Sequence, residues 1–183
     1  MKMNWAPIIN QVLSKYMKSS CNKKVIYRDI ILQKHIKQDR RIKFAQMKIG
    51  LIWQSLLGHL PGVQDLGVGD ASSLDLKFTN DQGQKYIIEL KNSYNTDNAS
   101  SRARNIQKLA RYAETHTDYI PIYGIINSKI PTGQDKVVTF ENMQVRMLTG
   151  PLFFKFIFQN IDYEPVIESL ANQIEPYLKD MIE

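Results

Sequence analysis

The chain has 183 residues, 43% of them hydrophobic, which fits one domain of ordinary size that buries a core without disulfides. Its one cysteine excludes a disulfide framework, and no apolar run reaches the roughly 20 residues that span a bilayer. We therefore expect no membrane segment and a cytoplasmic location, and the net charge of +6 favours a polyanionic partner.

The charge is unevenly distributed along the chain. Residues 1–48 carry a net charge of +10, whereas residues 162–183 carry a net charge of −5. A basic half attracts nucleic acid, because each neutralised phosphate releases counterions. A Lys-rich helical surface exposed to water explains the same pattern, so charge alone leaves both interpretations open.

Amphipathic spacing predicts helices in the first third of the chain, and turn residues then introduce two strands. The helices are expected over residues 4–18, 24–38 and 41–57. A Gly- and Asp-rich loop over 63–70 is expected before strands over 72–79 and 85–91, which flank a polar turn over 80–83. The short turn favours a hairpin.

Helices and strands alternate in the second half. Asn98 is a suitable N-cap for a helix over 99–115, and a buried strand is expected over 119–126, where Pro121 favours a strand start or an edge. Shorter strands are predicted over 136–140 and 144–148, and helices over 150–159 and 163–182. This order predicts an α/β fold with a mixed central sheet flanked by helices.

Alternation along the two strands of the hairpin brings charged side chains to one face. The apolar face of the first strand is expected to consist of Leu74, Leu76 and Phe78. Asp75 then points to the opposite face, and Glu89 and Lys91 share one face of the second strand. In a hairpin Asp75 can sit beside Glu89, so two carboxylates and an ammonium group surround one point.

This arrangement suits a divalent metal and a phosphodiester. Mg²⁺, with Mn²⁺ as an alternative, prefers hard oxygen ligands and keeps several waters. Such an ion lowers the pKa of a bound water, while Lys91 would hold the scissile phosphate or stabilise developing negative charge. A surface hairpin with a pair of opposite charges explains the same spacing. Asp70 is an alternative ligand to Asp75, although its place in a loop favours a turn role.

A polar run over 92–98 follows the second strand directly, and Arg102 comes soon after it, so groups that favour phosphate lie on both sides of the carboxylates. Asp75 with Glu89-Leu90-Lys91 resembles the core motif of PD-(D/E)xK nucleases. The longer run over 88–101 resembles type II restriction endonucleases more specifically, in particular the subgroup that cuts GG-N-CC or GG-W-CC palindromes. The resemblance covers roughly residues 41–126.

The resemblance implies a restriction-endonuclease-like core within one nuclease domain, with extra helices at both ends. The domain would span residues 1–183, with a basic helical region over 1–40, the catalytic core over 41–126, and C-terminal strands and helices over 127–183.

It also implies roles for single residues. Asp75 and Glu89 would bind the metal, and Lys91 would be the catalytic lysine. Many relatives carry a glutamate on the preceding helix, where this chain offers Gln46 and Gln54. These two would support the site by binding a metal water, or would be ordinary polar helix residues. One versus two metal ions therefore stays open.

Contacts with double-stranded DNA are expected from the polar run and from the helix after it. The residues are Asn92, Tyr94, Asn95, Thr96, Asn98, Ser100, Ser101, Arg102, Arg104 and Lys108. A capped loop and a solvated helix face are their alternative roles. Because protein symmetry mirrors the symmetry of a palindromic site, the resemblance also implies a homodimer.

The sequence therefore predicts a Mg²⁺-dependent type II site-specific deoxyribonuclease, which hydrolyses phosphodiester bonds in double-stranded DNA at a short palindrome. One alternative is a structure-selective nuclease with the same core, of the junction resolvase or repair type. Another is a non-catalytic DNA-binding protein, against which the intact Asp-Glu-Lys set argues.

Overall fold

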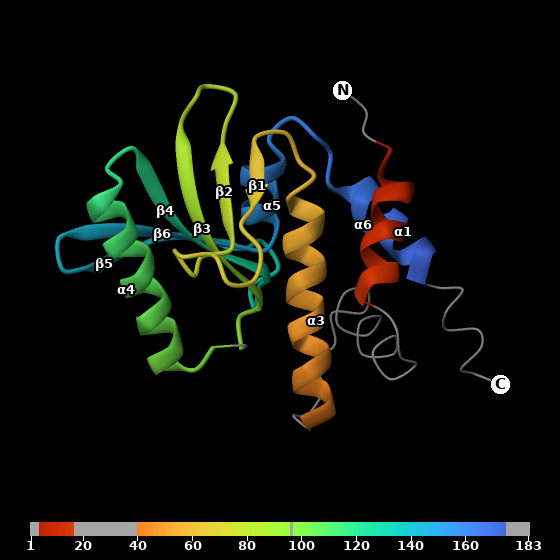
Figure 1. The fold of residues 1–183 in the computed structure, drawn as a ribbon, viewed down its shortest axis with the longest axis horizontal. Helices are drawn as coiled ribbons and strands as arrows, with labels where there is room; N and C mark the ends of the chain where they lie inside the picture. The colour runs from red at the N-terminus through yellow and green to blue at the C-terminus, as the bar shows by residue number, and fades with distance from the viewer. Residues whose placement is uncertain (1–3, 17–39, 96, 175–183) are drawn as a thin grey trace. The chain divides into compact units, whose positions relative to one another are not determined.

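A computed structural model describes residues 4–16, 40–95 and 97–174, without the side chains of 40–48, 171, 173 and 174 (Figure 1). The chain forms two compact units. Residues 57–159 make up the sheet unit, and residues 1–56 and 160–183 make up the helical unit. The helix predicted over 24–38 lies outside the described residues, and the single domain over 1–183 stays a prediction.

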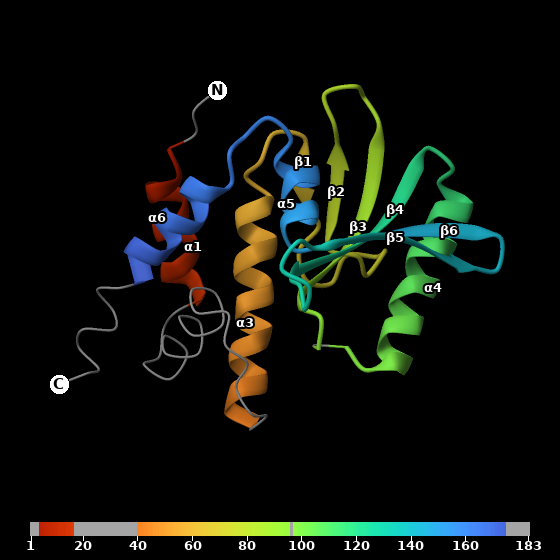
Figure 2. The same ribbon diagram turned by 180° about the vertical axis from the view of Figure 1, so that it is seen from behind.

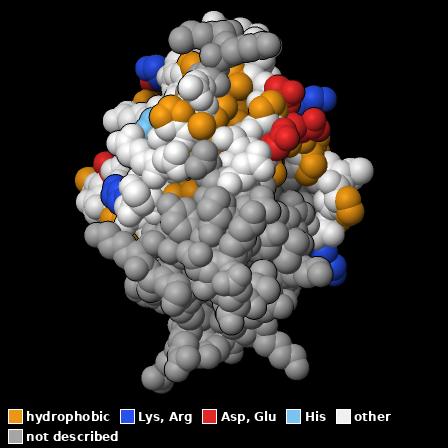
Figure 3. All heavy atoms as spheres, turned by 90° about the vertical axis from the view of Figure 1, so that its right-hand side faces the viewer, with side chains coloured by type: hydrophobic (Ala, Val, Ile, Leu, Met, Phe, Trp, Pro, Cys, Tyr) orange, Lys and Arg blue, Asp and Glu red, His pale blue; other side chains and the backbone are white. Residues whose placement is uncertain are grey.

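The helical unit contains α1 (Trp5–Tyr16), α3 (Arg40–Leu57) and α6 (Glu164–Ile174). Apolar residues at helical spacing are buried on α1, and α1 packs against α6. Of the acidic C-terminal segment, the structure describes Asp162, Glu164 and Glu168, and all three are exposed. Acidic side chains also gather in one group on the face seen in Figure 3.

The described part of the sheet unit contains a six-stranded sheet with the order β1-β2-β3-β4-β6-β5. Its strands are β1 (Val63–Asp65), β2 (Leu76–Thr79), β3 (Lys85–Ser93), β4 (Tyr119–Asn127), β5 (Gln134–Phe140) and β6 (Met143–Thr149). The β3-β4 and β4-β6 pairs are parallel, and the other pairs are antiparallel. The predicted α/β fold with a mixed sheet flanked by helices is confirmed.

The start of the first hairpin strand differs from the prediction. The strand expected over 72–79 begins only at Leu76, because the preceding residues form a turn. In that turn the carboxylate of Asp70 accepts hydrogen bonds from the backbone N–H and the hydroxyl of Ser72, and Ser73 adopts a φ of 55°. Part of the loop expected over 63–70 is also a strand, since β1 pairs with β2.

This turn changes the direction of Leu74, which was expected to lie beside Leu76 and Phe78. Leu74 instead packs in a core cluster with Ile87 and Leu109. Strict alternation holds only in extended backbone. The left-handed conformation of Ser73 interrupts it one residue before Leu74.

Helices α4 (Ala99–Thr115) and α5 (Pro151–Phe158) cover opposite faces of the sheet (Figures 1 and 2). The predicted N-cap is present, because the side chain of Asn98 accepts a hydrogen bond from the backbone N–H of Ser101 at 2.8 Å. On the other face, a Cβ at Gly124 would lie 2.4 Å from the ring of Phe153. Glycine at this position of β4 therefore allows α5 to approach the sheet closely.

Pro121 lies inside β4, which is a central strand. Its partner on β3 is Ile87, whereas pairing of β4 with β6 starts only at Ile122. At Pro121 the strand therefore has a neighbour on one side, which suits a residue without a backbone N–H.

Among the described helices, none is long and apolar enough to cross a membrane.

Candidate active site

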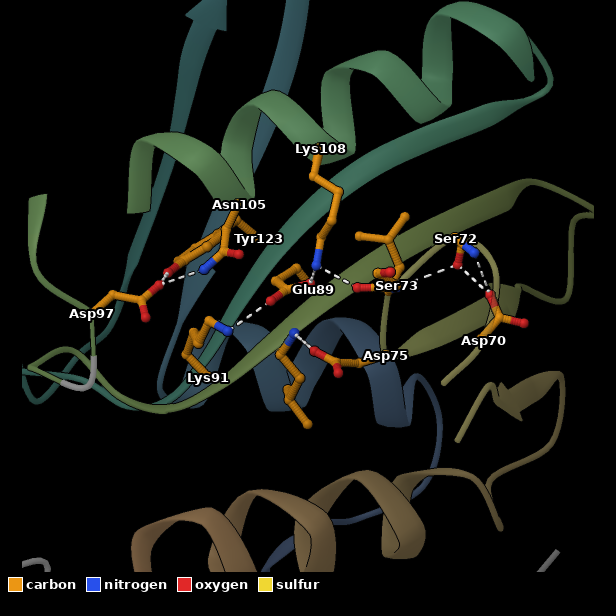
Figure 4. A network of polar contacts seen from close by, with 12 residues as sticks. Asp70, Ser72, Ser73, Asp75, Glu89, Lys91, Asp97, Asn105, Lys108 and Tyr123 are labelled. Carbon is orange, nitrogen blue, oxygen red and sulfur yellow. Dashed lines mark hydrogen bonds and ion pairs between the residues drawn. The ribbon is translucent and has the colours of Figure 1, made fainter. Parts of the chain in front are cut away.

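The β2–β3 hairpin places Asp75 opposite Glu89. Leu76 pairs with Ile88 in the antiparallel register, and the backbone N–H of Asp75 donates to the carbonyl of Ile88 at 3.1 Å. The side chain of Asp75 turns toward β3, where its Oδ2 accepts a hydrogen bond from the backbone N–H of Leu90 at 2.6 Å (Figure 4). The structure thus brings the two predicted carboxylates to adjacent positions of paired strands.

Glu89 is a buried acid with a cation on each oxygen. It lies on β3, a central strand, and its side chain is only 5% exposed. Lys91 Nζ lies 2.6 Å from Oε1, and Lys108 Nζ lies 2.6 Å from Oε2. A buried carboxylate needs such partners, because desolvation of an unpaired charge is costly.

Burial and charge change how two of these groups bind protons. Burial, together with the charge of Glu89, raises the pKa of Asp75 to about 6, although the N–H of Leu90, Lys91 and Lys108 act in the opposite direction. Burial acts to lower the pKa of Lys91, but Glu89, Asp97 and Asp75 together outweigh it, so the pKa of Lys91 is raised. Lys91 therefore stays an ammonium group.

Asp97 is an acidic neighbour of this site that the sequence reasoning did not single out. Its Oδ2 accepts hydrogen bonds from the hydroxyl of Tyr123 at 2.6 Å and from the amide of Asn105 at 2.8 Å (Figure 4). Its charge also contributes to the raised pKa of Lys91. One signal for it was available, since a tyrosine on a buried strand needs a partner for its hydroxyl.

Lys108 lies in a place that differs from the expectation. The sequence analysis predicted that Lys108 is one of several cations on a helix face that contacts DNA. In the structure it reaches from α4 to Glu89 and also donates a hydrogen bond to the carbonyl of Ser73 (Figure 4). Sequence spacing on α4 separates Lys108 from the apolar stripe but does not show which strand faces it.

Several other predicted DNA-contacting residues have partners within the chain. The buried Asn92 accepts a hydrogen bond from the amide of Asn127 at 3.5 Å. Arg102 donates to the backbone carbonyl of Tyr94 at 2.9 Å. Arg104 Nη2 lies 3.5 Å from the hydroxyl of Ser101.

Asn98, Ser100 and Ser101 lie at the start of α4. Asn98 Oδ1 accepts from the hydroxyl of Ser100 as well as from the N–H of Ser101. Asn95 is exposed, and Thr96 lies outside the described residues. DNA contact by any of these residues stays a prediction.

The two glutamines belong to the other unit. Gln54 is buried on α3, and Gln46 falls in the part of α3 whose side chains are not described. A role for either in binding a metal water stays a prediction.

The donor set of the site fits magnesium. Asp75 and Glu89 offer hard carboxylate oxygens, and Mg²⁺ is commonly bound through one or two carboxylates plus waters and substrate phosphate. Glu89 is buried, and desolvation together with the charge of Glu89 raises the pKa of Asp75 to about 6, so the two acids concentrate negative charge that a cation would stabilise. Within the described residues no group of three or more His, Cys, Asp or Glu could hold a metal ion.

The mixed sheet with a helix on each face defines an α/β core of the restriction-endonuclease type. The sequence profile of the Eco47II restriction endonuclease family matches residues 8–179, and the chain belongs to this family. Its members are site-specific deoxyribonucleases, a class of hydrolases that acts on double-stranded DNA. A search of curated proteins finds no match to the chain.

Proposed function

We propose that the chain is a Mg²⁺-dependent type II restriction endonuclease in which Asp75 and Glu89 hold the metal ion and Lys91 is the catalytic lysine. The observation that carries this proposal is the hairpin register, which sets the two carboxylates side by side with Lys91 2.6 Å from Glu89. Family membership supports the nuclease activity, and the geometry supports the choice of residues.

The reaction is hydrolysis by water, with no covalent intermediate. The water oxygen forms a bond to phosphorus, one P–O ester bond breaks, and the leaving oxygen takes up a proton while the attacking water loses one. When bound, Mg²⁺ lowers the pKa of that water and polarises a phosphoryl oxygen. Lys91 remains protonated and stabilises the negative charge that develops on the phosphate.

We further propose a short palindromic recognition site. Eco47II, which gives the family its name, recognises GGWCC. We infer for this chain a site of the form GG-W-CC or GG-N-CC, and a homodimer whose two-fold axis matches that of the site.

Cleavage of unmethylated plasmid DNA in the presence of Mg²⁺ tests this function. We expect discrete fragments from the wild-type chain and a loss of about 10³-fold or more in rate for Asp75→Ala and Lys91→Ala. Lys85→Gln is the matched control, because it removes a lysine from an exposed ion pair on the same strand, and we expect wild-type cleavage.

Three results would count against the proposal. Wild-type cleavage by Asp75→Ala would remove that residue from the site. Cleavage of branched DNA without any of linear duplexes would indicate a structure-selective nuclease. DNA binding without cleavage of any substrate would indicate a non-catalytic protein.

A further inference from the structure

The packing of α4 on the sheet places Lys108 at the proposed metal site. The next two residues of the helix, Leu109 and Ala110, are fully buried in the core between α4 and the sheet. Lys108 Nζ lies 2.6 Å from Glu89 Oε2 and also donates to the carbonyl of Ser73. Its side chain is 29% exposed, against 5% for Glu89.

A metal ion that binds to Glu89 would compete with the two ion pairs that Glu89 forms with Lys91 and Lys108 in this structure. Each of its two oxygens is already 2.6 Å from an ammonium nitrogen. Asp75 and Glu89 carry two negative charges, which Lys91 and Lys108 balance. A divalent cation on Glu89 would repel both lysines and would compete with them for the carboxylate oxygens.

The surroundings of the two lysines indicate which one is displaced. Lys91 follows Glu89 on the same strand and has the negative charge of Asp97 nearby as a second source of stabilisation. The charge of Asp75 acts on both lysines, whereas the other hydrogen-bond partner of Lys108 is the Ser73 carbonyl, which is neutral. Once separated from Glu89, Lys108 therefore has an ammonium group to offer to an anion.

We propose that Lys108 is a second catalytic cation, which occupies Glu89 until the metal ion binds and then contacts the scissile phosphate. This inference rests on the function proposed above. It also explains how a site with two carboxylates stabilises the transition state: among the described residues no third acid joins them to hold a second metal ion, and Lys108 supplies the second positive charge instead.

The sign of the change in metal affinity tests the first half of this role. Mn²⁺ alone is titrated calorimetrically into the full chain and into Lys108→Gln. Loss of the competing charge should tighten Mn²⁺ binding by about tenfold. If Lys108 instead only supports the turn at Ser73, the variant loses the shape of the site and binds Mn²⁺ more weakly.

Cleavage under saturating Mg²⁺ tests the second half. We expect Lys108→Gln to cut plasmid DNA about 100-fold more slowly, as is typical when one donor to a developing negative charge is removed. Lys108→Arg keeps the charge and should recover most of that loss. Lys85→Gln should match the wild type in both assays. Unfolding curves of all variants check that each chain is folded.

Weaker Mn²⁺ binding by Lys108→Gln, or cleavage at the wild-type rate, would overturn this role of Lys108 while the wild-type chain still binds metal and cuts DNA. A wild-type chain that neither binds Mn²⁺ nor cuts DNA would overturn the proposed function itself, and the role of Lys108 with it.

Discussion

The start and the middle of β3 carry lysine–carboxylate pairs of similar length in different surroundings. At its start Lys85 Nζ lies 2.9 Å from Asp118, with side chains 45% and 56% exposed. Four residues further along, Glu89 is almost fully buried between Lys91 and Lys108. An exposed pair contributes little because water already solvates both charges. Burial, rather than pairing, therefore separates the proposed site from ordinary surface charge.

The largest effect on the free energy of unfolding is expected when the buried carboxylate of Glu89 is neutralised, and the matching change in the exposed pair is Asp118→Asn. Glu89→Gln leaves two lysines around a neutral amide in a desolvated place, and we expect a loss of about 3 kcal/mol in the free energy of unfolding of the metal-free chain. Asp118→Asn should shift the unfolding midpoint far less, because the pair that it breaks is exposed. Urea denaturation measures both, and equal effects of the two changes would show that burial does not distinguish the two pairs.

Asp75 and Asp118 should make the stability of the chain depend on pH with opposite signs. The pKa of Asp75 is raised to about 6, so the folded metal-free chain binds a proton near pH 5 that the unfolded chain does not bind. Its stability should therefore fall by about 1–2 kcal/mol as the pH rises from about 4 through 6. The hydrogen bond from Lys85 lowers the pKa of Asp118, so the stability contributed by that acid is instead lost as the pH falls.

Urea denaturation in the presence of a chelator, at several pH values, measures this difference. Asp75→Asn should remove the loss of stability between pH 4 and 6, and a wild-type curve parallel to that of the variant would show that the prediction is wrong. Because protons compete with the metal for Asp75, Mg²⁺ affinity should decrease as the pH falls through about 6.

The smallest effect concerns two tyrosines on β4 that lie opposite the two pairs. Tyr123 pairs with Glu89 in the parallel register, and Tyr119 pairs with Lys85. Tyr123→Phe removes the buried hydrogen bond to Asp97 and should cost about 1 kcal/mol in the free energy of unfolding. Tyr119→Phe keeps the ring that Lys77 and Lys85 approach and should cost less. Thermal unfolding compares them, and equal losses would argue against a special role for the Tyr123 hydroxyl.

The juxtaposition at the site could be predicted from the sequence because it depends on local rules. Alternation on β3 puts Glu89 and Lys91 on one face, and the short turn fixes the register that brings Asp75 to Glu89. The N-cap at Asn98 follows equally from its side-chain chemistry.

Other features depend on contacts between distant segments, which spacing does not reveal. The position of Lys108 is set by how α4 docks on the sheet, so helical periodicity identified its face but not its partner. The direction of Leu74 depends on the left-handed conformation of Ser73, a residue that rarely adopts it. The position of Asp97 depends on its hydrogen bond with Tyr123, which lies 26 residues further along the chain.

The parallel crossover from β3 through α4 to β4 has a consequence for the making of the protein. The hairpin with Asp75 and Glu89 is translated early, whereas α4 packs on a surface that includes β4 and therefore needs residues up to about 127. The contact of Lys108 with Glu89 and the hydrogen bond from Tyr123 to Asp97 can therefore form only after most of the sheet unit has been synthesised. A ribosome-bound fragment that ends before β4 therefore carries both carboxylates of the proposed metal site but lacks the contacts that α4 and β4 add to it.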